Sequence, residues 1–155
     1  MAEYKERLGI FEFSEVFPYV VFDEDLPSEL VPRNCQWKMP PEFYDLVERE
    51  FRGYKVNMYS TGYQMFARKG VECTSCKIIG EYLALERYTN RQGVPKTLRC
   101  HFSLYAVKDG QEILMTQDHI VPKCEGGPTR LENLQTMCTY CNNAKGYATG
   151  TYLQF

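Results

Sequence analysis

The chain has 155 residues, of which 44% are hydrophobic and 14% aromatic, and its formal net charge is −2. These values are typical of about one folded domain and exclude a disordered, collagen-like or low-complexity chain. No apolar run approaches the roughly 20 residues that a membrane-spanning helix needs, and the first residues lack the apolar core of a secretion signal. We therefore expect a cytoplasmic protein without a membrane partner.

The charge is unevenly distributed along the chain. Residues 1–67 contain 7 Lys or Arg against 12 Asp or Glu, residues 68–108 contain 8 against 3, and residues 109–155 contain 3 against 5. The basic middle segment suits contact with a phosphate backbone, with the acidic N-terminal segment facing away from it. A scattered set of solvated charges is the alternative explanation.

The first 66 residues predict an extension of mixed α and β structure whose role no motif indicates. Aromatic-rich segments at 11–13 and 16–22 alternate in part and predict one or two strands. The stretch 23–41 is rich in Asp, Glu and Pro and predicts a loop. A protein partner or a second copy of the chain is the expected contact of this extension.

A helix is predicted for 41–54. Pro41 suits a first helical turn, apolar residues recur on one face, and Gly53 provides a stop. A short strand is then expected near 55–59, and a helical or irregular segment at 61–69.

The rest of the chain predicts β structure and a closing helix. Three segments rich in Tyr, Leu, Val and Ile are predicted as strands: 78–87, 97–107 and 112–117. The dipeptide Asp109-Gly110 between the last two is a strong hairpin signal. A short return strand is predicted at 131–136 and a helix at 138–147.

Four of the seven cysteines form two Cys-x-x-Cys pairs, Cys73 with Cys76 and Cys138 with Cys141. Each pair puts two sulfurs on one turn, where they can take adjacent corners of a tetrahedron around zinc. In a reducing compartment this pattern predicts a structural zinc site rather than disulfides, and a thioredoxin-like redox pair would explain only one of the two pairs. The remaining cysteines are expected to be small apolar fillers or inert thiols: Cys35, Cys100 and Cys124.

The stretch 117–146 carries the most specific pattern in the chain. It contains Asp-His-Ile-x-Pro, Gly-Gly, Asn-Leu, and Cys-x-x-Cys-Asn followed by Lys, in the residues Asp118, His119, Ile120, Pro122, Gly126, Gly127, Asn133, Leu134, Cys138, Cys141, Asn142 and Lys145. This pattern resembles the HNH endonuclease family, and the stretch 68–86 is similar to small HNH proteins of bacteriophages. The resemblance implies an α+β fold, with a ββα-metal (HNH) nuclease core and a four-cysteine zinc site over residues 67–155 and an α+β N-terminal extension over 1–66.

The residue types also suit phosphodiester hydrolysis on chemical grounds. Histidine titrates near neutral pH, so the neutral imidazole of His119 can take a proton from water. The carboxylate of Asp118 and the amide oxygen of Asn142 are sufficient protein ligands for a hard divalent cation.

The resemblance implies matching roles for these residues. His119 would be the general base, Asp118 and Asn142 would hold a catalytic Mg²⁺ or Mn²⁺, and Asn133 would tie the loop backbone and so orient His119. Asn142 as a helix cap, with Asn143 as the ligand, is an alternative. Lys145 is expected either to contact a phosphate or to be solvated.

We therefore expect a metal-dependent HNH endonuclease that hydrolyses DNA, located in the host cytoplasm if it is encoded by a phage. Two alternatives stay open at this point. One is a non-catalytic, zinc-stabilised module that binds nucleic acid or a protein. The other is a nuclease that acts on RNA or on branched DNA, because such a site contacts phosphate and metal rather than base edges.

Overall fold

The computed structural model describes residues 4–31, 40–97 and 99–148. The strands are β1 (Tyr4–Phe11), β2 (Glu48–Phe51), β3 (Tyr54–Asn57), β4 (Tyr82–Thr89), β5 (His101–Lys108), β6 (Gln111–His119) and β7 (Leu134–Cys138). The α-helices are α1 (Phe13–Val16), α2 (Pro41–Val47), α3 (Thr61–Lys69) and α4 (Thr139–Ala148). Five short 3-10 helices complete the described part: η1 (Phe17–Tyr19), η2 (Asp23–Asp25), η3 (Ser28–Leu30), η4 (Lys123–Glu125) and η5 (Leu131–Asn133).

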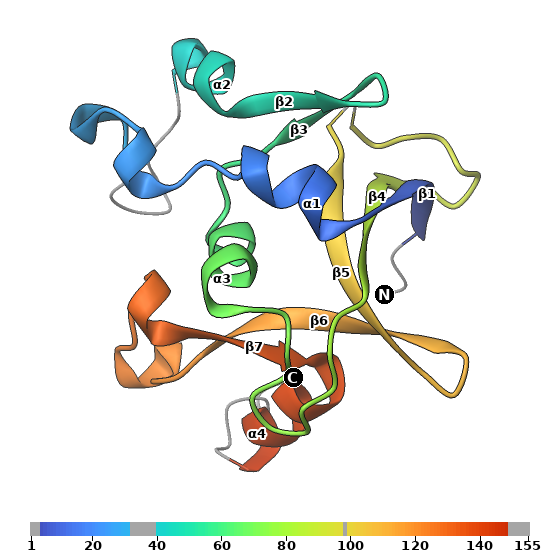
Figure 1. Cartoon of the computed structure of the whole chain (residues 1–155), viewed down its shortest axis with the longest axis vertical. Helices are drawn as coiled ribbons and strands as arrows, with labels where there is room; N and C mark the ends of the chain where they lie inside the picture. The colour runs from blue at the N-terminus through green and yellow to red at the C-terminus, as the bar shows by residue number, and fades with distance from the viewer. Residues whose placement is uncertain (1–3, 32–39, 98, 149–155) are drawn as a thin grey trace.

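These elements form an α+β fold, as predicted. One sheet has the strand order β1-β4-β5-β6-β7, each neighbouring pair being antiparallel, and β2 and β3 form a separate hairpin. Figure 1 shows α2 and this hairpin at one end of the molecule and α4 at the other, across β6 and β7. Among the helices of the described residues, none is long and apolar enough to cross a membrane.

The strands predicted at 11–13 and 16–22 are wrong. Phe11 ends β1, and the chain then turns through α1 and η1. The backbone N–H of Glu12 donates to Glu15 Oε2 at 2.8 Å, which closes the first helical turn. Pro18 then stands in the first turn of η1, where a missing N–H costs nothing. Local capping therefore outweighs the partial alternation of aromatic residues.

The helix predicted for 41–54 is correct only as far as Val47. The chain continues as β2, turns at Arg52 and Gly53, and returns as β3. Arg52 has φ 51° and Gly53 has φ 89°, the pair of positive angles that a type I′ hairpin turn requires. Phe51 is buried in this arrangement, because the hairpin packs it against the main sheet.

The later predictions agree more closely with the structure. Of the two alternatives expected for 61–69, the structure has the helical one, α3, and the strands predicted at 78–87, 97–107 and 112–117 overlap β4, β5 and β6. Asp109 and Gly110 form the hairpin turn between β5 and β6. Residues 131–133 form η5 rather than strand, so the return strand begins at Leu134.

An aromatic cluster joins the N-terminal part to the main sheet. Phe102 of β5 meets Phe11 and Phe51 edge to face, with ring centroids 5.4 and 4.9 Å apart, and all three side chains are buried. Strand β1 also pairs along β4 in the sheet that contains β6 and β7. The division of the chain at residues 66 and 67 stays a prediction, but the two parts share one core.

We predict that Phe102→Ala lowers the free energy of unfolding by about 3–5 kcal/mol, because a cavity replaces a buried ring. Urea denaturation of the purified protein measures this change. Ile79→Ala is the control, since Ile79 is 57% exposed, and we expect it to change stability by less than about 0.5 kcal/mol. Equal stability of the two variants would contradict the role of the cluster.

Candidate functional site

Four cysteines from two distant turns meet beside the sheet. The Sγ atoms of Cys73, Cys76, Cys138 and Cys141 all lie within 4.8 Å of one another, and those of Cys76 and Cys138 are 3.8 Å apart. A tetrahedral zinc ion with Zn–S bonds of about 2.3 Å separates its sulfurs by about 3.8 Å. The predicted convergence of the two pairs is confirmed, and the donor set fits zinc.

The pKa values of the cysteines in the cluster are shifted in opposite directions. Burial raises the pKa of Cys138, whereas N–H groups of Cys138, Cys76 and Ser75 outweigh burial and lower the pKa of Cys73. Cys141 N donates to Cys138 Sγ at 3.4 Å, as a first-turn N–H does to an N-cap side chain. Because neighbouring thiolates repel one another, a divalent ion is needed for all four sulfurs to ionise together.

The other three cysteines lie apart from this cluster or outside the structure's description. Cys100 is buried and Cys124 is exposed. Cys35 falls outside the described residues. The buried position of Cys100 agrees with the expected apolar filler.

Hydrogen bonds of three threonines fasten the cluster to the sheet and the helix. Thr74 N donates to Thr136 O of β7 at 3.0 Å, and Thr136 Oγ1 donates to Gly70 O at 2.7 Å. At the start of α4, Thr139 Oγ1 donates to Leu114 O of β6 at 2.7 Å. The segment around Cys73 is therefore fixed to β7, and the first turn of α4 is fixed to β6.

Strand β6 and helix α4 bring the two predicted oxygen donors to one interface. Thr116 and Asp118 share a face of β6, because side chains alternate along a strand. Asn142 Nδ2 donates to Thr116 Oγ1 at 3.0 Å, and Lys145 Nζ donates to Asp118 Oδ2 at 2.6 Å. Asn142 and Lys145 are three residues apart and share a helix face. Asp118 and Asn142 therefore occupy adjoining positions across the interface.

Lys145 is held within this interface rather than solvated alone. Its Nζ donates to the carbonyl oxygen of His119 at 2.7 Å as well as to Asp118. Gln135 Nε2 donates to the same Asp118 Oδ2 at 2.8 Å. Side chains from β7 and α4 therefore both bind the carboxylate of Asp118, a residue that is only 8% exposed.

The candidate base, His119, ends β6 and is partly buried. Its Nε2 lies 2.9 Å from Thr129 Oγ1, so within the described residues the ring is hydrogen-bonded to Thr129 rather than to Asp118 or Asn142. Burial lowers the pKa of His119, the charge of Lys123 lowers it further, and Asp118 opposes the shift. The imidazole is therefore neutral at neutral pH, the form that accepts a proton.

Asn133 closes the loop that follows His119. Its Oδ1 accepts from Val121 N at 2.9 Å, and its Nδ2 donates to Val121 O at 3.1 Å and to Pro128 O at 2.8 Å. A Cβ at Gly127 would lie 1.7 Å from Val121 O, so the close approach requires glycine. The loop therefore has a fixed backbone.

Sequence reasoning missed three contributors to the site: Thr116, Thr129 and Gln135. Strand periodicity could have found Thr116, two residues before Asp118. Gln135 is found only through the register, because it pairs with Asp118 across β6 and β7. No local signal marks Thr129, which reaches His119 through the fold of the loop.

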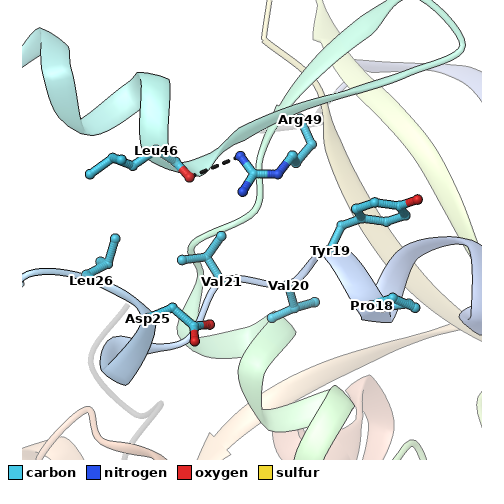
Figure 2. A pocket seen from close by; sticks show the side chains of 8 residues that line it. All are labelled: Pro18, Tyr19, Val20, Val21, Asp25, Leu26, Leu46 and Arg49. Atoms are coloured by element: carbon cyan, nitrogen blue, oxygen red, sulfur yellow. Dashed lines mark hydrogen bonds between the residues drawn. The ribbon is translucent and has the colours of Figure 1, made fainter.

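A pocket of about 390 Å³ lies apart from these residues, in the N-terminal part of the chain. Figure 2 shows the side chains that surround it: Pro18, Tyr19, Val20, Val21, Asp25, Leu26, Leu46 and Arg49. A hydrogen bond orients the guanidinium of Arg49, because its Nη1 donates to Leu46 O at 3.0 Å. Neither β6 nor α4 contributes to the lining.

Residues 107–148 match the family model described as HNH endonuclease. No curated protein and no solved structure matches the chain. The matched segment includes β6, β7 and α4, and therefore contains Asp118, His119, Asn133 and Asn142. Over this segment, which is about a quarter of the chain, the sequence is similar to an HNH endonuclease domain. The match indicates a nuclease of the HNH type, with a nucleic-acid substrate and a divalent metal.

We predict that Cys141→Ser removes bound zinc and lowers the midpoint of thermal unfolding by about 10 °C, because the cluster anchors α4. Mass spectrometric metal analysis and thermal denaturation measure the two effects. Cys124→Ser is the matched control and should retain both the metal and the midpoint. Equal metal content in the two variants would show that Cys141 is not needed to hold the metal.

We predict that Asn133→Asp destabilises the protein by about 1–3 kcal/mol, because two backbone carbonyls lose their buried amide donors. Chemical denaturation measures this loss. Asn143→Asp provides the comparison, since Asn143 is exposed on α4, and its stability should stay within about 0.5 kcal/mol of the parent. A similar free energy of unfolding for both variants would mean that the hydrogen bonds from Asn133 to the loop backbone contribute nothing to stability.

Proposed function

We propose that the protein is a metal-dependent endonuclease that hydrolyses phosphodiester bonds in DNA. One observation carries this proposal, the arrangement of the β6–α4 interface. There Asn142 is hydrogen-bonded to Thr116 and Lys145 to Asp118, so that Asp118 and Asn142 occupy adjoining positions. The candidate base follows Asp118 directly on the same strand. The HNH match over this segment supports the same conclusion.

His119 is the general base in this proposal. Its lowered pKa keeps the ring neutral, and its hydrogen bond with Thr129 fixes the ring orientation. With Nε2 engaged by Thr129, Nδ1 is the nitrogen that takes a proton from the attacking water. Asn133 is a positioning residue, because it holds the backbone two residues after the base.

The donors on β6 and α4 fit a hard divalent cation such as Mg²⁺ or Mn²⁺. Asp118 offers a carboxylate, and Asn142 offers an amide oxygen whose orientation is set by the amide nitrogen bonded to Thr116. Such an ion, when bound, supplies Lewis-acid stabilisation of the phosphate and of the departing 3′ oxygen. Gln135 and Lys145 hold the Asp118 carboxylate in place.

Two further assignments belong to this proposal. Lys145 contacts a phosphate oxygen at the edge of the site, since its ammonium group already lies beside Asp118 and the His119 carbonyl. The four-cysteine cluster holds a structural zinc ion, because four protein sulfurs leave no open position for water.

One such site cuts one strand, so a monomer is expected to nick a duplex.

Three further expectations stay predictions. They are the cytoplasmic location, the similarity to bacteriophage proteins, and a second copy or protein partner at the N-terminal extension.

The decisive experiment incubates the protein with supercoiled plasmid in Mg²⁺ or in EDTA. We expect nicking in Mg²⁺ only, and a rate at least about 100-fold lower in His119→Ala, because a general base contributes that factor or more. His101→Gln is the control, since it alters the other histidine and should retain cleavage.

Each other outcome has a definite meaning. Full activity in His119→Ala contradicts the assigned base. If the plasmid stays intact while RNA or branched DNA is cleaved, that nucleic acid is the substrate instead of duplex DNA. Binding without any cleavage supports the non-catalytic module instead.

A further inference from the structure

Two branched apolar side chains lie exposed directly after the candidate base. Ile120 is 47% exposed and Val121 is 45% exposed. Scattered surface apolar residues are ordinary in proteins. This pair differs because it is adjacent in sequence and begins at the strand end where His119 stands.

The backbone that carries this pair is fixed. Val121 is held through both its N–H and its carbonyl by the Asn133 side chain, and Ile120 N donates to Asn133 O at 2.8 Å. The close packing of Gly127 on Val121 O closes the loop behind them. The two side chains therefore project from a rigid loop, and a partner would not have to order them on binding.

The charges of the loop favour one kind of partner. Lys123 and Arg130 are exposed cations in this loop, but Glu125 and Glu132 balance them. A locally neutral loop with two exposed apolar residues offers phosphates no net positive charge. It suits contact with the less charged sugar and base edges that lie between two phosphate backbones.

We propose that Ile120 and Val121 form a wedge that enters the minor groove of a DNA duplex and unstacks one base step beside the scissile phosphate. This inference rests on the proposed nuclease function and adds the form of the preferred substrate. Apolar wedges of this kind partly unstack and kink duplexes in other DNA-binding proteins. The substrate class is therefore duplex DNA that opens easily, at a mismatch or at a flexible pyrimidine–purine step.

The test uses the full chain carrying His119→Ala, so that binding is measured without cleavage. Two short duplexes are compared, one fully paired and one with a single mismatch, each with 2-aminopurine beside the step. Fluorescence anisotropy gives the affinity, and 2-aminopurine emission reports unstacking. We expect the mismatched duplex to bind about tenfold more tightly, because the mismatch removes part of the unstacking cost.

In the same background, Ile120→Ala with Val121→Ala should reduce the preference to about twofold or less and abolish the rise in emission. The matched control is Ile10→Ala with Val94→Ala, an Ile and a Val that are 49% and 56% exposed on other segments. The control should keep both the preference and the emission change. If the alanine pair lowers the melting temperature, Ile120→Thr with Val121→Thr replaces it, because threonine keeps the branched shape.

The outcomes separate the wedge from the nuclease proposal. An unchanged mismatch preference in the wedge variant overturns the wedge and leaves the nuclease proposal standing. If the wild-type protein cleaves no nucleic acid and binds no duplex, both proposals fail. If the substitutions instead dissociate a dimer in sedimentation analysis without altering the preference, the pair is a contact between copies and the wedge is wrong.

Discussion

The four-sulfur cluster is the constraint on which the candidate site depends. Helix α4 has ten residues, a length at which an isolated helix is marginal in water. Cys138 and Cys141 fix its first turn, and the turn containing Cys73 and Cys76 is bonded in turn to β7 through Thr74. Asn142 follows Cys141 directly, so the cluster also sets the position of the proposed metal ligand.

A second constraint fixes the opposite side of the site. The loop after β6 is closed by Asn133, while Asp118 is held by Gln135 from β7 and Lys145 from α4. The end of β6 and the loop that follows it are therefore anchored by different neighbours. Such an arrangement is pre-organised, because the groups need little rearrangement when a substrate binds.

The N-terminal part supports these strands through the shared core. Phe11 and Phe51 pack on Phe102 of β5, and β5 leads through the turn at Asp109 and Gly110 into β6. A loss of packing at Phe102 therefore weakens the strand that precedes the site. The pocket beside Arg49 lies in the same N-terminal part, away from β6 and α4.

Local spacing in the sequence predicts the two cysteine pairs, the turn at Asp109 and Gly110, and the motif around Asp118, whereas it leaves a helix and an irregular segment both open at 61–69. Their residues are close in sequence, so their geometry follows from short-range rules. Tertiary structure alone decided that the helix from Pro41 ends at Val47, because burying Phe51 and pairing β2 with β3 outweigh helical periodicity. It also decided that Gln135 and Thr129 join the site, because strand register and loop closure bring together residues that no local pattern connects.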